Sequence, residues 1–172
     1  DEPIYNTNGL QWIDEHSCYC SAQKGDNFSL FELHDNGDVR CLVSEQHKDY
    51  MYPQKIDHDL FYIERSVHKN KIIYQIIQSF YPHESPRIII NFYERPIVFL
   101  HMISEEEGFV LEHAENIDSA DTITRLSYHH LTRKNDLWNN TILFSFSIPV
   151  NLVLPGNERI YESLLPLLPR IE

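Results

Sequence analysis

The sequence predicts an α+β protein, mainly an antiparallel β meander, with one or two short helices toward the C-terminus. Between Leu60 and His113, runs rich in Ile, Val, Phe and Tyr alternate with only two to six punctuating residues. Prolines in this stretch fall in the connections, where their missing N–H removes no ladder hydrogen bond. The length of 172 residues suits a single domain, residues 1–172. We expect about seven to nine strands in a curved sheet or a sandwich.

The first predicted hairpin joins Phe28–His34 to Val39–Glu45 through an Asp35–Asp38 turn. The turn has Asn-Gly at its centre, and this pair tolerates the positive φ angles of a type I′ turn. Pairing outward from that turn places Leu30 opposite Val43, Phe31 opposite Leu42, and Glu32 opposite Cys41. The predicted core face carries Phe28, Leu30, Val39, Cys41 and Val43.

The segments on either side of this hairpin are less regular. Upstream, Leu10–Ile13 and the segment around Cys18–Cys20 each suit a short strand or an irregular cover. Downstream, Gln46–Asp59 is polar and long for a simple connection, so it is predicted as an exposed loop. Long loops on rigid sheets often carry function.

The predicted meander consists of Leu60–Val67, Ile72–Tyr81, Arg87–Glu94, Ile97–Ile103 and Phe109–His113. Two of its runs, Ile88–Ile90 and Ile97–Leu100, are apolar on both sides. Strands of this kind are covered on both faces, so the sheet must pack against a helix, a second sheet or its own continuation.

The C-terminal third combines helical and strand patterns. Asp118 and Ser119 could cap a helix on which Ile123, Leu126 and Leu131 share a face, although Thr122, Thr124 and Tyr128 favour a competing strand. Strict alternation of Ile142, Phe144, Phe146 and Ile148 predicts a half-buried strand. The segment Asn157–Leu165 predicts a short helix that Pro166 ends.

The chain is strongly acidic, with 26 Asp and Glu against 14 Lys and Arg and a formal charge of −12. This charge argues against nucleic acid, because phosphate contacts are made by Lys and Arg. It also disfavours anionic membrane surfaces, and no run approaches the roughly 18 to 20 apolar residues that a membrane-spanning helix needs. Excess acid either keeps the protein soluble or attracts a cationic partner.

The three cysteines bear on the compartment of the protein. Cys18 and Cys20 point the same way on a strand but lie too far apart along the backbone for an unstrained bridge, so one of them is expected to pair with Cys41. Such a disulfide would add about 3 kcal/mol in an oxidising compartment. Three reduced, buried cysteines in a cytoplasmic protein are the alternative. A chain that begins at Asp1 also fits cleavage of a targeting segment or trimming, and we expect a secreted or periplasmic protein.

No motif for chemistry stands out. The sequence has no glycine-rich phosphate loop, nucleophile elbow or zinc-ligand spacing, so no catalytic residue, metal ligand or cofactor is predicted. None of the ten histidines has the helix-borne spacing of zinc hydrolases, and the adjacent His129 and His130 would not chelate one ion. The cluster that most resembles a functional site is Asp57-His58-Asp59, but charged residues in a solvent-exposed loop would give the same pattern.

A partner-binding surface is the better prediction. The run Glu105–Glu107 lies at a turn between two strands and could dock into a cationic cleft. Tyr50, Tyr52 and Trp138 lie in polar neighbourhoods and could supply apolar anchors, since Tyr and Trp are prominent in interfaces. The predicted partner-binding residues are Asp57, Asp59, Tyr50, Tyr52, Glu105, Glu106, Glu107 and Trp138.

Three functions follow from these patterns. The preferred one is a non-enzymatic acidic protein that neutralises a basic protein partner, a toxin or an enzyme, in the manner of an inhibitor or immunity protein. The first alternative is a small-molecule or lipid carrier with a lipocalin-like cup. The second alternative is a hydrolase whose residues come together only in the fold.

Overall fold

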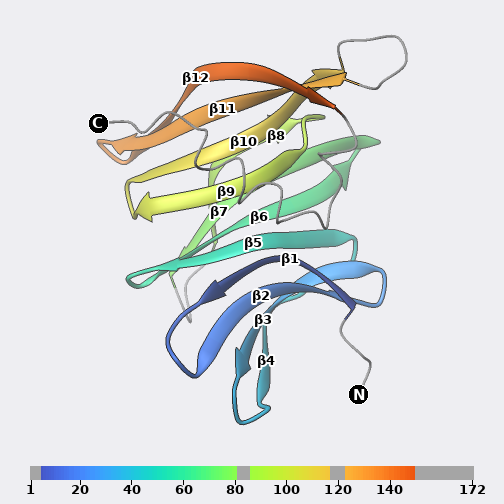
Figure 1. Ribbon diagram of the computed structural model, residues 1–172, viewed down its shortest axis with the longest axis vertical. Helices are drawn as coiled ribbons and strands as arrows, with labels where there is room; N and C mark the ends of the chain where they lie inside the picture. Colours follow the sequence, from blue (N-terminus) through green and yellow to red (C-terminus); the bar gives the residue numbers. More distant parts are fainter. Residues whose placement is uncertain (1–4, 81–85, 117–122, 150–172) are drawn as a thin grey trace.

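Strands make up the regular structure throughout the part of the chain that can be described. The computed structural model describes residues 5–80, 86–116 and 123–149, which form twelve strands in three four-stranded antiparallel sheets (Figure 1). The predicted antiparallel sheets are confirmed, but the α+β class and the seven to nine strands are wrong. These described ranges contain no helix, and hence none that could cross a membrane.

Each sheet is a meander of four consecutive strands. The first sheet contains β1 (Tyr5–Trp12), β2 (Ser17–Lys24), β3 (Asn27–His34) and β4 (Val39–Val43). The second contains β5 (Lys48–Ile56), β6 (Asp59–His68), β7 (Lys71–Phe80) and β8 (Arg87–Tyr93). The third contains β9 (Ile97–Ser104), β10 (Glu107–Asn116), β11 (Ile123–Lys134) and β12 (Leu137–Pro149).

The first predicted hairpin exists as β3 and β4, but its register differs from the prediction. His34 N–H donates to Asp38 O, so the loop has three residues, and among them only Gly37 has a positive φ, +90°. This geometry replaces the type I′ turn and shifts the pairing by one residue next to the turn, which moves side chains there to the opposite face. Cys41 therefore lies opposite Phe31, and Val39 and Cys41 are exposed instead of forming the core face. A register shift between Leu30 and Phe31 then restores the predicted pairing of Leu30 with Val43.

Two predicted non-strand segments are strands. The loop expected over Gln46–Asp59 contains β5, whose Tyr50 and Met51 are buried on opposite faces. The expected helix around Ile123 to Leu131 is β11, which pairs along its whole length with β12, so the competing strand prediction is correct. The tail helix expected at Asn157–Leu165 lies outside the described residues.

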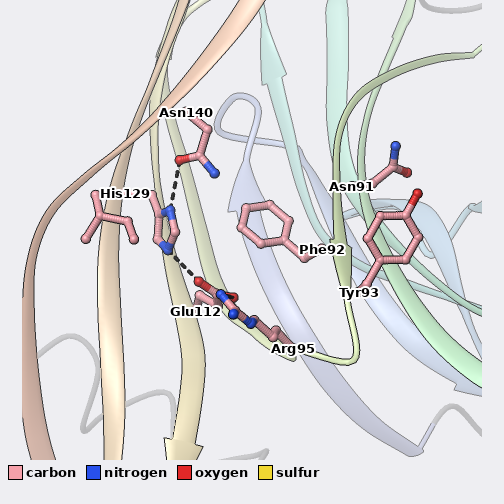
Figure 2. A pocket seen from close by; sticks show the side chains of 8 residues that line it. Asn91, Phe92, Tyr93, Arg95, Glu112, His129 and Asn140 are labelled. Carbon is pink, nitrogen blue, oxygen red and sulfur yellow. Dashed lines mark hydrogen bonds and ion pairs between the residues drawn. The ribbon is translucent and has the colours of Figure 1, made fainter.

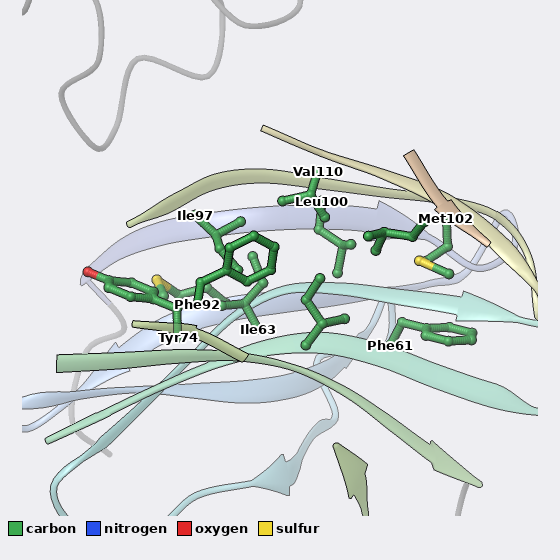
Figure 3. Close-up of a cluster of buried hydrophobic side chains, with 11 residues drawn as sticks. Phe61, Ile63, Tyr74, Phe92, Ile97, Leu100, Met102 and Val110 are labelled. Carbon is green, nitrogen blue, oxygen red and sulfur yellow. The ribbon is translucent and has the colours of Figure 1, made fainter. Parts of the chain in front are cut away.

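The second sheet lies between the other two and is apolar on both faces (Figure 1). On β6, Leu60 and Tyr62 pack toward the first sheet, whereas Phe61 and Ile63 pack toward the third. The larger cluster joins the second and third sheets, as Figure 3 shows. It contains Met51, Phe61, Ile63, Tyr74, Ile76, Phe92, Ile97, Leu100, Met102, Val110 and Leu131. The expectation of a second layer over the sheet is thus confirmed.

Two glutamine side chains tie the sheets together where strands from different sheets approach. The Gln54 amide of β5 donates to Leu100 O at 2.8 Å and accepts from Met102 N–H at 2.6 Å. The Gln11 amide of β1 makes the same pair of bonds with Lys55 N–H and O. A primary amide offers one acceptor and two donors in one plane, so it can match the donor and acceptor on a strand edge. These contacts hold β5 against both neighbouring sheets.

The predicted disulfide is absent. All three cysteines are free, with Cys18 and Cys20 buried and Cys41 exposed. Cys20 pairs with Phe31 of β3, which in turn pairs with Cys41 of β4. One whole strand therefore lies between Cys20 and Cys41, a separation of about 10 Å across two strand spacings, whereas a bridge needs Cα atoms within about 7 Å. Without a disulfide, the cysteines give no support for an oxidising compartment.

Candidate functional site

The predicted partner-binding residues do not form one exposed surface. Tyr50 and Asp59 are almost fully buried, Tyr50 against Tyr62 and Asp59 against the Gln78 amide. Tyr52 is half-buried beside Phe99. These three side chains pack within the protein in this conformation, and a partner role for them stays a prediction.

The remaining predicted residues have basic neighbours. Glu105 and Glu106 form the turn between β9 and β10, and Glu106 O accepts a hydrogen bond from Arg133 N–H at 2.7 Å. Glu107 is paired with His130 at 2.7 Å. Trp138 lies opposite Arg133 in the ladder and packs on Phe61, while Asp57 is exposed in the β5–β6 turn. Arg133 meets the Glu105–Glu107 turn through its backbone, and its guanidinium pairs with Asp136 at 2.6 Å.

A second acidic surface, which the sequence did not single out, lies at one end of the first sheet. The β1–β2 and β3–β4 turns lie side by side, because Asp35 N–H donates to His16 O at 2.8 Å. The His16 ring also pairs with the Asp35 carboxylate at 2.6 Å. We call the exposed carboxylates of Asp14, Glu15, Asp35 and Asp38 in these turns the acidic tip. His16 is the one basic side chain within the two described turns.

Local hydrogen bonds keep part of the acidic tip ionised. The Asp14 carboxylate accepts from His16 N–H at 2.8 Å and from the Ser17 hydroxyl at 2.9 Å. These bonds, the His16 amide first, lower the pKa of Asp14 below its ordinary value. Asp38 is fixed by Asn36, whose amide donates to its carboxylate and whose oxygen accepts from its N–H.

Exposed apolar side chains adjoin the acidic tip. Directly paired residues point to the same face of a sheet, so Trp12, Cys18, Leu33 and Val39 form one row across the first sheet. Trp12 is 67% exposed and Val39 55% exposed, at the two ends of the row. Three strand spacings separate them, or about 14 Å. A large exposed aromatic beside charged residues is the composition of a protein interface.

A pocket lies at the side of the molecule where β8 and β12 face each other without pairing. It has a volume of about 410 Å³ and is lined by residues of both sheets (Figure 2). The lining residues are Asn91, Phe92 and Tyr93 of β8, Arg95 of the β8–β9 connection, Glu112, His129, Asn140 and Ile142. This volume lies within the range of small-molecule sites.

The wall of the pocket on the third sheet holds a buried charged network. Glu112 is 1% exposed and His129 is 3% exposed, and Glu112 Oε2 lies 2.6 Å from His129 Nε2. Asn140 Oδ1 lies 2.8 Å from His129 Nδ1, and Arg95 donates to Glu112 Oε1 at 3.3 Å. Both ring nitrogens thus lie within hydrogen-bonding distance of a side-chain oxygen.

This network is suited to holding charge more than to bond-breaking chemistry. Both nitrogens of His129 are engaged, so neither is open to take a proton from a substrate as placed. The residues lining the pocket include no Ser, Thr or Cys, the usual hydroxyl and thiol nucleophiles. Across the described ranges, no three His, Cys, Asp or Glu side chains converge as metal ligands.

One signal in the sequence could have located this network. Val110 is a core residue, and Glu112 follows two positions later on the same strand, so its carboxylate must point into the same interior. A buried carboxylate needs a cationic or hydrogen-bonding partner. Naming His129 as that partner required the register between β10 and β11, which a single sequence does not give.

No family model matches the chain. No curated protein is similar enough in sequence to be matched. The functional conclusion therefore depends on the geometry of the acidic tip and of the pocket.

Proposed function

We propose that this chain is a non-enzymatic acidic binding protein whose partner is a basic protein. The observation that carries the proposal is the acidic tip next to the exposed Trp12. Interfaces combine a buried aromatic anchor with a polar rim, and opposite charges on the partners speed their association. An inhibitor or immunity protein acts in this way.

The acidic tip supports the proposal better than the Glu105–Glu107 turn does. Four carboxylates share the tip with one histidine, so its local potential is strongly negative. The Glu105–Glu107 turn has three carboxylates, one of them 2.7 Å from the His130 ring, and a backbone hydrogen bond from Arg133 brings that residue next to the turn. A basic partner would meet less repulsion from like charges at the tip.

Binding to a panel of basic and acidic proteins, measured by biolayer interferometry at low and high salt, tests the proposal. We expect a basic protein to bind at low salt and to be released at high salt. Removing charge at the tip with Glu15→Gln and Asp38→Asn should weaken that binding about tenfold. The double change Glu105→Gln and Glu106→Gln removes the same charge elsewhere and is the matched control.

Trp12→Ala tests the apolar part of the surface separately. It should increase the dissociation rate of the complex while leaving the salt dependence of association unchanged, because rim charges govern encounter and buried anchors govern lifetime. If no basic protein binds at low salt, or if the tip and control variants bind equally, the proposed surface is wrong.

A further inference from the structure

The pocket between β8 and β12 has an unequal supply of donors and acceptors. The oxygens of three lining side chains are already engaged: Glu112 with Arg95 and His129, Asn140 Oδ1 with His129, and Asn91 Oδ1 with the Gln75 amide. The donors are only partly used. A guanidinium has five N–H groups, and Arg95 uses one nitrogen on Glu112.

The Asn140 amide is a second donor that is open to a ligand. Because its oxygen faces His129, its Nδ2 group has two hydrogens directed elsewhere, and Figure 2 shows that nitrogen on the side of Phe92. Arg95 lies across the same space, with its side chain 57% exposed. Arg95 and Asn140 therefore present donors to a ligand, from the β8–β9 connection and from β12 respectively.

Local charge in the pocket does not oppose an anion. The Arg95 guanidinium is paired with the Glu112 carboxylate at 3.3 Å and offsets its charge. The protein as a whole carries −12, which repels anions at long range. Salt screens that repulsion beyond about 8 Å at physiological ionic strength, so the nearest charges decide inside the pocket.

The rest of the lining is apolar. Phe92 forms one wall and meets the His129 ring edge to face at 5.5 Å, and Ile142, which pairs with His129 in the ladder, also lines the pocket. An apolar wall favours a ligand that has a hydrophobic body as well as an acceptor-rich head. Water alone or a fully hydrated ion would make no apolar contact with this wall.

We propose that the pocket binds a small organic carboxylate, its carboxylate held by Arg95 and the Asn140 amide and its apolar body against Phe92 and Ile142. The site is separate from the acidic tip, and it does not depend on the proposed basic partner. The proposal is for binding alone and includes no chemical step.

Titration of the protein with benzoate, followed in ¹H–¹⁵N correlation spectra, tests the proposal. We expect saturable shifts for amides of β8, β11 and β12. Benzamide has the same size but no charge and should bind about tenfold more weakly or worse, because it loses a charge-assisted hydrogen bond. Inorganic phosphate should also bind more weakly than benzoate, because it lacks the apolar body.

Two variants test the roles of the named donors. Asn140→Asp retains an oxygen toward His129 but replaces the open donor with a carboxylate oxygen, and it should weaken benzoate binding at least about tenfold. Arg95→Gln should have a similar effect. Arg40→Gln, on the first sheet, removes the same charge far from the pocket and should leave the affinity unchanged.

Any of four results would overturn the assignment. These are the absence of benzoate shifts, equal affinity for benzamide, equal affinity for phosphate, and unchanged benzoate affinity in a folded Asn140→Asp protein. Since none of these measurements uses a protein partner, failure here leaves the proposal for the acidic tip standing.

Discussion

Replacing His129 with leucine should destabilise the protein by about 3 kcal/mol, because it strands the buried Glu112 carboxylate. The pair is 2.6 Å apart, and neither side chain is more than 3% exposed. After the change, Glu112 keeps only Arg95, at 3.3 Å and largely exposed to solvent. Removing one member of a buried pair costs about 3–5 kcal/mol, and the remaining Arg95 contact favours the lower end.

Urea unfolding followed by tryptophan fluorescence measures this loss. With a slope of roughly 2 kcal/mol per molar urea, the midpoint should fall by about 1.5 M. His130→Leu is the matched control, because the neighbouring His130–Glu107 pair is partly exposed and should be worth under about 1 kcal/mol. The double change Glu112→Leu and His129→Leu should recover most of the loss, since it leaves no unpaired buried charge. A cost below about 1 kcal/mol for His129→Leu, or a double variant less stable than either single one, would refute the reasoning.

Three further predictions concern packing, backbone and thiols. Leu131→Ala, at a fully buried site, should cost about 2–5 kcal/mol in urea unfolding, whereas exposed Leu137→Ala should change stability by under about 0.5 kcal/mol. Gly9→Ala should cost at least about 2 kcal/mol in the same assay, because its φ is +96° and a Cβ would lie 2.8 Å from a Cα atom of β5. Native-state alkylation followed by mass spectrometry should label Cys41 quickly and Cys20 only after unfolding, because burial raises the pKa of Cys20 to about 11. If the protein without reductant had a mass lower by two hydrogens, it would contain a disulfide, and the prediction of free thiols would be wrong.

The sequence located the strands of the meander well, because each pattern there is local. The segments predicted from Leu60 to His113 correspond to β6 through β10 within a few residues at each end. The connection between the predicted strands Arg87–Glu94 and Ile97–Ile103 is where the chain passes from the second sheet to the third. Whether that connection continues one sheet or begins another depends on packing between distant residues, which a local pattern does not contain.

The errors arose where local preference and tertiary packing disagree. Helical spacing of Ile123, Leu126 and Leu131 was outweighed by pairing of β11 with strands on both sides. At the first hairpin, Asn-Gly indicated a turn correctly, but the loop took three residues instead of two and reversed which face Val39 occupies. One residue of loop length misplaced Val39 and Cys41, while Leu30 and Val43 lie in the core as predicted.

The candidate sites were harder to predict than the strands. Asp14 and Asp35 are far apart in sequence, and only the alignment of β1–β2 with β3–β4 brings their turns together. The pocket likewise draws Arg95, His129 and Asn140 from a connection and two strands. Such sites are set by register and sheet stacking, which residue patterns specify only once the fold is known.

Because every strand pairs with a neighbour in sequence, the three sheets occupy consecutive stretches of chain, 5–43, 48–93 and 97–149. Closing a hairpin between adjacent strands costs little loop entropy, and chains with mostly local pairing fold faster than Greek-key topologies. Amide hydrogen exchange should therefore reveal three cooperative units that open separately. The middle unit, which is clamped on both sides, should be the last to exchange.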